Sequence, residues 1–367
     1  MLSLSTLGRQ LHSGERSFNV IGLRKVFISI SAACIIISVL AVSILGLNPA
    51  IEFRGGSEFT ISQVQNTSQQ PAYDALKADK LDEGARVSNV GLDGIRVQTH
   101  SLSSEETTKV ASDLAKAYNV DKDKITSTFV GPTWGAGVTK KALTSLAIFL
   151  VFVSLLMTFY FRNWRMALSA LVALLNDMAL LAGFFAITRV EISPATVIGF
   201  LTILAYSLYD TVVVFDKVRE LTKNYDGQYR YTYGELVNLA VNQTFVRSIN
   251  TSIVALLPVG SILVIGTWLL GAGTLLDISL ALFVGMIAGA FSSLFIASPI
   301  LTVMNDRTEA GKAHNEAVLK RRNGNSNEAD EDGAEGKTGA PVKVAPLQAG
   351  GHRGQLAQPK RKPRSKR

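Results

Sequence analysis

The sequence of 367 residues lacks the usual marks of a catalytic site. It has one cysteine, Cys34, which excludes a disulfide framework, and because Cys34 lies inside an apolar run we expect it to serve packing rather than thiol chemistry. There is no nucleotide loop of the G-x-x-x-x-G-K type and no nucleophile constellation. No cluster of His, Cys and Asp stands at metal-ligand spacing. We therefore expect no enzymatic activity and no cofactor or metal.

Charged residues are nearly absent from six apolar stretches. Each stretch is long enough to cross about 30 Å of hydrocarbon, which needs roughly 20 helical residues. The stretches are residues 26–47, 142–161, 166–188, 194–215, 248–270 and 278–298. Four of them contain no charged residue, and the exceptions are Asp177 in the third and Asp210 in the fourth. The sequence therefore predicts a polytopic α-helical membrane protein with six transmembrane helices.

The basic residues of the short connections predict the orientation. Lys and Arg residues gather in a head, residues 1–25, and in the connections 162–165 and 217–247, whereas 189–193 holds one basic residue and 271–277 holds none. Because short cytoplasmic loops carry the excess of Lys and Arg, both termini are predicted to be cytoplasmic. The first apolar stretch is too long for the hydrophobic region of a cleaved signal, so we expect a retained signal anchor.

Residues 48–141 are then a small extracytoplasmic domain. Alternation and β-branched content predict strands in 51–61, 85–90, 94–100 and 124–130, and a helix over 103–118. Ser103 followed by Glu106 is a capping-box pattern at the start of that helix. The pattern predicts an α+β domain with a helix on a mainly antiparallel sheet, and it favours a binding or mechanical role over chemistry.

The C-terminal segment, residues 306–367, has a different composition. It carries 14 Lys and Arg against 8 Asp and Glu, so it accounts for most of the net charge of +8. Its Gly, Ala, Pro and polar residues show no apolar periodicity, so we expect a disordered cytoplasmic tail. The basic end suits anionic lipid headgroups or ribosomal RNA better than sequence-specific nucleic acid, and a solvated tail without a partner stays open as the simpler alternative.

The two acidic residues inside apolar stretches are candidate functional groups. With the apolar edge at Lys217, Asp210 lies roughly 10 Å inside the cytoplasmic boundary, and Asp177 lies about 17 Å past Met166. An Asp at a helix centre costs on the order of 2.5–3.5 kcal/mol, and such residues mark proton or ion pathways. The side chain of Asp210 is too short to reach the cytosol from that depth. Asp177 either relays protons or bonds neighbouring helices.

The sequence also suggests a partner for Asp210. Spacings of three and four give its helix a small or polar face that includes Tyr206 and Ser207. Arg247 stands at the start of the fifth stretch with Asn250 and Thr251 on the same helical face, so it is a candidate cation for Asp210. It could equally be an ordinary positive-inside residue. Pro258 is expected to kink its helix.

Several ordered stretches resemble the SecF family of the bacterial protein-export machinery, within the RND superfamily of ion-driven transporters. They include YSLYDTVVVFDKVRE (206–220), NQTFVRSINTSI (242–253), FSSLFIASPIL (291–301), RNWRMALSALVALLND (162–177), VGPTWG (130–135) and IEFRGG (51–56). The resemblance covers roughly residues 25–305. Tyr209 departs from it, since the family has Asn there, and so does Asn176, where His commonly precedes the Asp.

The resemblance implies that Asp210 and Arg247 take part in ion coupling, with Asp177 as a further ionisable group. The supporting residues would be Tyr206, Ser207, Thr211, Asn250 and Thr251. Gly55 and Gly56 suit a hinge of the external domain or a simple turn into its first strand.

The resemblance also implies partners and a location. A SecD subunit would complete a twelve-span assembly beside the SecYEG channel and the SecA motor in the bacterial plasma membrane, surrounded by lipid. The proton or sodium gradient would help to pull unfolded preprotein outward late in translocation. Two alternatives stay open: half of an RND-type exporter of lipids or drugs, and a passive scaffold. Exporters of that kind usually carry two large external loops in each half, so the short connection 189–193 counts against the exporter.

Overall fold

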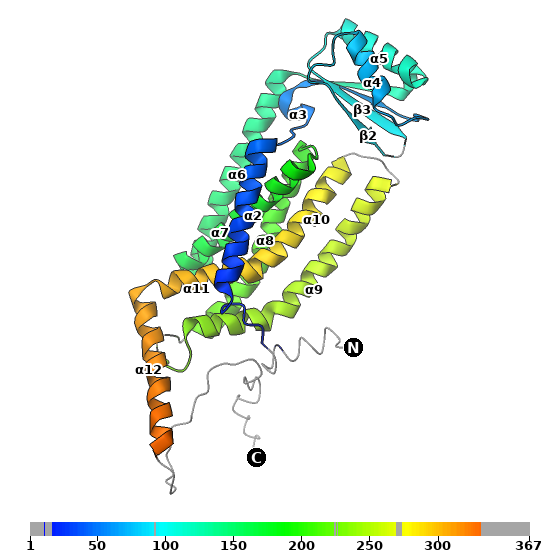
Figure 1. Ribbon diagram of the computed structural model, residues 1–367. Coiled ribbons are helices and arrows are strands. Elements are labelled where there is room, and N and C mark those ends of the chain that lie inside the picture. Colours follow the sequence, from blue (N-terminus) through cyan, green and yellow to red (C-terminus); the bar gives the residue numbers. More distant parts are fainter. Residues whose placement is uncertain are drawn as a thin grey trace, which may run out of the picture.

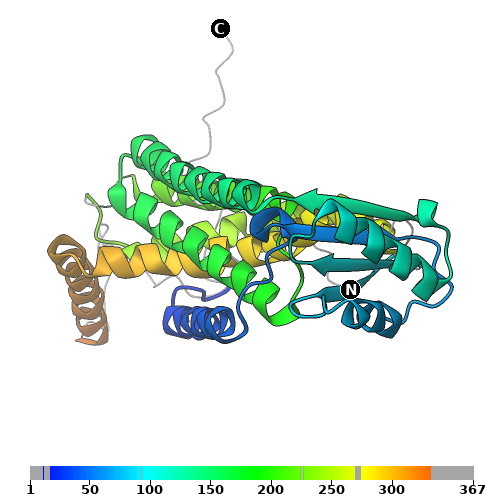
Figure 2. The ribbon, with the colours of Figure 1, turned by 90° about the horizontal axis from the view of Figure 1, so that it is seen from above.

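The structure is a computed structural model that describes residues 11, 17–91, 93–223, 225, 227–268 and 274–331, with 267–268 and 323–331 described by their backbone. Most of the predicted head and residues 332–367 of the predicted tail lie outside these residues. The described part has a sheet domain at one end, which we call the external domain after its predicted location, a helical bundle in the middle and a helix, α12, at the other end (Figures 1 and 2).

The bundle contains the six predicted spans, each in a helix long and apolar enough to cross a membrane. The helices are α2 (Arg24–Leu45), α6 (Pro132–Phe161), α7 (Trp164–Thr188), α8 (Pro194–Thr222), α9 (Tyr233–Trp268) and α10 (Thr274–Ser292), and α10 continues through a π-helical turn η2 (Ser293–Ala297) into α11 (Ser298–Asp306). Within the most apolar 18 residues of each helix, about half are buried in α7, α8 and the α10–α11 unit, whereas few are buried in α2, α6 and α9. The exposed faces are apolar, as expected for surfaces that meet lipid or another membrane chain.

The predicted cytoplasmic loop 217–247 is largely helical, so that prediction is corrected. α8 runs to Thr222 and α9 begins at Tyr233, which leaves residues 223–232 as the connection. The first turns of α9 are helical because Tyr233, Val237 and Val241 pack into the core of the bundle. α6 likewise begins at Pro132, ahead of the predicted span, since proline is favoured in the first helical turn.

The external domain confirms the α+β prediction. Its elements are β1 (Gly56–Ile61), α4 (Gln70–Ala78), β2 (Arg86–Val90), β3 (Gly94–Thr99), α5 (Ser104–Tyr118), a short 3-10 turn η1 (Lys122–Lys124) and β4 (Ile125–Val130). The strands form an antiparallel sheet in the order β2-β3-β1-β4, and Figure 1 shows α4 and α5 on the side away from the bundle. Ser103 and Glu106 form the expected capping box of α5. Helix α4, which buries Ala72 and Leu76 against the sheet, was not predicted.

The predicted strand 51–61 is wrong in its first part. Residues Ile51–Arg54 form a short helix, α3, and the strand starts only at Gly56. Gly55 and Gly56 have φ values of +78° and +147°, and a Cβ on Gly56 would lie 2.4 Å from the carbonyl oxygen of Thr99. A Cβ on Gly55 would lie 2.8 Å from Cα of Pro132 in α6. These contacts are those of a tight, packed turn, and a hinge motion at this turn stays a prediction.

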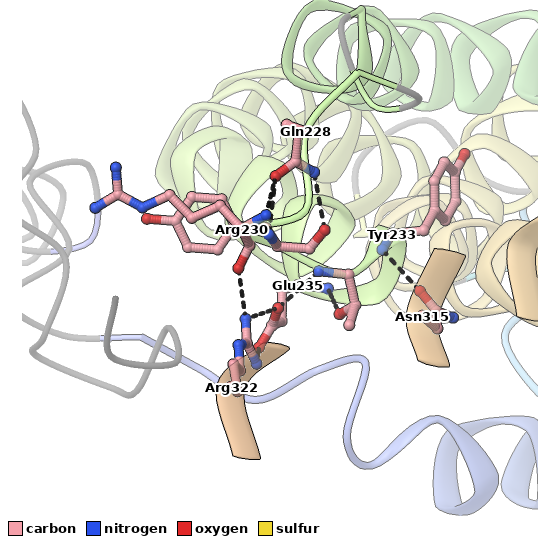
Figure 3. A network of polar contacts seen from close by, with 8 residues as sticks. Gln228, Arg230, Tyr233, Glu235, Asn315 and Arg322 are labelled. Atoms are coloured by element: carbon pink, nitrogen blue, oxygen red, sulfur yellow. Dashed lines mark hydrogen bonds and ion pairs between the residues drawn. The ribbon is translucent and has the colours of Figure 1, made fainter. Parts of the chain in front are cut away.

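The prediction of a disordered segment from residue 306 onward is wrong for residues 309–331. These residues form α12 (Glu309–Glu331), which starts just after α11 ends. Val318 is fully buried, and Asn315 accepts a hydrogen bond from the backbone N–H of Tyr233 at 3.4 Å. Figure 3 shows Arg322 reaching from α12 toward the start of α9. Composition averaged over the whole tail concealed this helix, because the following residues are polar and rich in glycine.

Replacing Arg322 by Ala is expected to release α12 from the bundle. Its guanidinium donates to both carboxylate oxygens of Glu235, at 2.8 and 2.7 Å, and to the carbonyl of Arg230 at 2.8 Å. Hydrogen bonds to charged groups contribute roughly 1.5–3 kcal/mol each, so the helix should open about tenfold more often or more. Hydrogen exchange of residues 309–322 measures this, and Lys320→Ala, an exposed change on the same helix, should have little effect.

Candidate functional site

Asp210 of α8 lies in the interior of the bundle. The residue is only 5% exposed, and its side chain accepts hydrogen bonds from two serine hydroxyls. Ser248 Oγ of α9 makes a short contact with Oδ2, and Ser293 Oγ donates to the same oxygen at 2.9 Å. Three helical elements therefore converge on one buried carboxylate.

Asp177 of α7 is also buried and belongs to a second hydroxyl network. Ser207 Oγ of α8 donates to Oδ2 at 2.6 Å, and the amide of Asn176 lies 3.4 Å from Oδ1. Ser31 of α2 donates to Asn176 Oδ1 at 2.7 Å. Asp177 is thus bonded to α8 and, through Asn176, its network reaches α2. A relay role for Asp177 stays a prediction.

The two carboxylates are linked along α8. Ser207, which bonds Asp177, stands three residues before Asp210, a rise of about 4.5 Å along the helix. Ser292 and Ser293 are consecutive residues where α10 meets η2, and Ser292 Oγ donates to the carbonyl of Ala173 in α7 at 3.4 Å. Both acids therefore lie in one polar layer that crosses the centre of the bundle.

Close helix packing makes this layer possible. A Cβ on Gly289 would lie 2.8 Å from Cβ of Ser207, and a Cβ on Gly285 would lie 2.6 Å from the side chain of Ile203. The G-x-x-x-G spacing therefore lets α10 approach α8 closely. The π-helical turn η2 begins at Ser293, and such turns are frequent at functional sites.

The predicted ion pair between Asp210 and Arg247 is not formed in this structure. Arg247 is exposed, and its side chain has no hydrogen bond or ion pair with any residue that the structure describes. The α9 residue that reaches Asp210 is its neighbour, Ser248, and consecutive helix residues point about 100° apart. The prediction named a residue of the helix that contacts Asp210, but the contact comes from the next residue, Ser248. The sequence does not fix how α9 is rotated against α8, so it could not decide between the two.

The predicted supporting residues divide into two groups. Tyr206 donates from its hydroxyl to the backbone carbonyl of Thr251 at 3.2 Å, which joins α8 to α9 beside the site. Thr211 is buried and donates to the carbonyl of Ser207 at 3.1 Å. Asn250 is exposed and takes no part in the site.

Pro258, where a kink is expected from the sequence, lies inside α9, and the helix continues through it.

Sequence reasoning missed the serines. Ser31, Ser248 and Ser293 all lie within apolar stretches, where a small hydroxyl residue usually serves helix packing. For Ser248 and Ser293 the available signal was the number of neighbouring hydroxyl residues, because NQTFVRSINTSI and FSSLFIASPIL each hold several within one short stretch.

The sequence matches the family described as protein export membrane protein SecD/SecF, C-terminal, over residues 109–307. The protein translocase subunit SecF of Streptomyces coelicolor is 41% identical, over 96% of this chain and 97% of the relative. The subunit of the same name from Mycobacterium tuberculosis is 38% identical, over 88% of this chain and 75% of the relative.

A solved structure has the same fold. The crystal structure of SecDF from Thermus thermophilus, described as a translocon-associated membrane protein, aligns with a TM-score of 0.72 at 26% identity. The alignment covers 80% of this chain and 39% of the SecDF chain. The matched part is therefore about two fifths of that protein.

Proposed function

This chain belongs to the SecD/SecF family of protein-export membrane proteins, and from that premise we propose that it couples a proton or sodium gradient to preprotein translocation through Asp210. It is a multi-pass membrane protein and an accessory subunit of the Sec translocase. The observation that carries the coupling proposal is a buried carboxylate held by two hydroxyls where α8, α9 and η2 meet.

The chemistry of the site supports a switch. A charged carboxylate inside the membrane is costly, and two hydroxyl donors offset only part of that cost. A proton, a sodium ion or a guanidinium arriving at Asp210 would each remove the unbalanced charge. The site can therefore hold alternative partners for one carboxylate, and exchange between them is the step that we assign to ion transfer.

Arg247 is the proposed alternative partner within the chain. It lies on the same helix as Ser248, and a rotation of α9 by about 100° would exchange one for the other beside Asp210. Asp177 would pass protons along the same layer through Ser207. One charge that crosses 100 mV releases about 2.3 kcal/mol, which is enough to shift a two-state helix arrangement.

The partners follow from the family. A SecD-type subunit is the expected companion, because the SecDF relatives are named for both parts and this chain covers the smaller share of them. The exposed apolar faces of α2, α6 and α9 offer surface for such a subunit and for lipid. We propose SecYEG, SecA and unfolded preprotein as further partners, the bacterial plasma membrane as the location, and cytoplasmic termini. We also propose that the chain has no enzymatic activity of its own.

Replacing Arg247 by Met tests the proposal against a passive scaffold. The chain and its SecD-type partner are reconstituted in vesicles, and ion uptake under an imposed gradient is measured for protons and for sodium. We expect uptake by the native pair and a loss of about tenfold or more in Arg247→Met, since this variant has no cation to offer buried Asp210 in the paired state that we propose, and an unpaired buried charge commonly costs about 2–5 kcal/mol. Arg307→Met, an exposed change on the cytoplasmic side, is the control. Absence of gradient-driven uptake by the native pair would favour the scaffold.

A further inference from the structure

The external domain contacts the bundle through the sheet face that α4 and α5 leave uncovered. Arg96 of β3 lies there, with Nη1 3.5 Å from Oε2 of Glu191 and Nε 3.6 Å from Oε1 of Glu58. Gln98 donates to Glu191 at 3.2 Å and to Glu58 at 3.0 Å. Glu58 belongs to β1 of the same sheet, whereas Glu191 belongs to the loop between α7 and α8, residues 189–193. Glu191 therefore joins the bundle to the sheet.

The same loop is bonded to the linker that leads from α2 into the external domain. The backbone N–H of Ile192 donates to the carbonyl of Asn48 at 2.8 Å, and the N–H of Ala50 donates to the carbonyl of Ile192 at 3.0 Å. The amide of Asn48 donates to the carbonyl of Arg189 at 2.9 Å. Loop and linker thus form a small parallel bridge and must move together.

The loop continues directly into the helix that carries Asp210. Ser193 caps α8 by accepting a hydrogen bond from the N–H of Thr196, and its hydroxyl donates to Asp277 at the start of α10 at 2.6 Å. α8 is unbroken from there to Asp210, a length of about 25 Å. A shift or rotation of α8 at the site therefore reaches the loop without passing through a flexible segment.

The contact is partly withdrawn from water. The side chains of Arg96 and Glu191 are 23% and 21% exposed, so their attraction exceeds that of a surface pair without being locked in a dry core. Burial raises the pKa of the neighbouring Glu52 carboxyl, and the charges of Glu58, Arg96 and Glu191 all act on it. The ion pair therefore adds to the contact between sheet and loop, beside the hydrogen bond from Gln98 to Glu191.

We propose that the 189–193 loop transmits the state of the Asp210 site to the external domain, and that Glu191 is the positioning residue that grips the sheet through Arg96 and Gln98. This proposal rests on the proposed function, because it assumes that Asp210 responds to an ion gradient. The contact of Glu191 with Arg96 and Gln98 lies outside the predicted membrane spans and is separate from the Asp210 site.

Glu191→Gln tests the proposal in vesicles that hold the full chain, its SecD-type partner and the translocation channel. The variant should keep gradient-driven ion uptake within about twofold of native. Gradient-driven preprotein export should fall at least about fivefold, because coupling between two sites commonly corresponds to a factor of about five or more. Glu58→Gln is the matched control: it removes the other carboxylate from Arg96 but leaves the interdomain contact, and should keep export. The exchange Glu191→Arg with Arg96→Glu, made in the Glu58→Gln background so that the new carboxylate at position 96 does not face Glu58, should restore export.

The outcomes separate the two proposals. Export that is unchanged in Glu191→Gln, or uptake that is lost together with export, would overturn the transmission role. Uptake that persists in Asp210→Asn would instead overturn the proposed function, whatever Glu191→Gln does.

A second measurement does not depend on export. With Cys34 replaced by Ala, spin labels at Glu105 on α5 and Val264 on α9, both exposed, report the distance between domain and bundle. The distance distribution should broaden in Glu191→Gln and stay native in Glu58→Gln. A native distribution in Glu191→Gln would contradict the proposal even if export were impaired.

Discussion

Replacing Asp210 by Asn is expected to abolish gradient-driven preprotein export while leaving the protein folded. Asn keeps the shape of the side chain and a carbonyl oxygen that can accept from Ser248 and Ser293, so the contacts among α8, α9 and η2 should survive. It can neither take up a proton nor balance a cation. The drive lost is about 2.3 kcal/mol for each charge that crosses 100 mV, equivalent to a factor of about fifty in rate.

Export from inverted vesicles measures this effect, with translocation in the absence of a gradient as the internal reference. Asp216→Asn is the matched control, since it makes the same substitution in the same helix at an exposed position that contacts Tyr160. It should leave export close to native. If Asp210→Asn exports as well as the native protein under a gradient, Asp210 is structural and the coupling mechanism is removed.

The position of Asp210 could be predicted from the sequence, but its partners could not. A lone carboxylate in an apolar run is conspicuous, and helical rise places its depth along the span. Its surroundings depend on how neighbouring helices are rotated, which is set by packing such as that of Gly285 against Ile203. A shift of one residue along α9 exchanges Ser248 for Arg247, and no pattern in the sequence decides between them.

Composition was least informative where a segment mixes two kinds of structure. Residues 306–367 have the average character of a disordered chain, yet Val318 and Arg322 hold a helix against the bundle. The strands of the external domain were easier to predict because the sheet has one apolar face. α4 was missed because it buries only a few small or aliphatic side chains and is otherwise polar.

The second large effect is expected from the packing of α10 against α8. In Gly289→Ala the new methyl group would lie 2.8 Å from Cβ and 3.0 Å from Oγ of Ser207, so the helices must separate. Overpacking of this kind costs roughly 1–3 kcal/mol. Separation would also draw Ser207 away from Asp177, whose Oδ2 it now bonds at 2.6 Å. The substitution should therefore weaken both the fold and the polar layer.

Gly266→Ala is expected to raise the stability of the protein, and it therefore serves as the control for Gly289→Ala. Gly266 lies in α9, and a Cβ added there would meet no atom within 4 Å, so alanine should stabilise the helix by about 0.4–1 kcal/mol. Unfolding of the purified protein by a denaturing detergent measures both changes. Ser207→Gly combined with Gly289→Ala removes the close Cβ contact, so the double variant should lose less stability than the two single changes together. Equal and small effects at Gly289 and Gly266 would show that α8 and α10 are not held at contact distance.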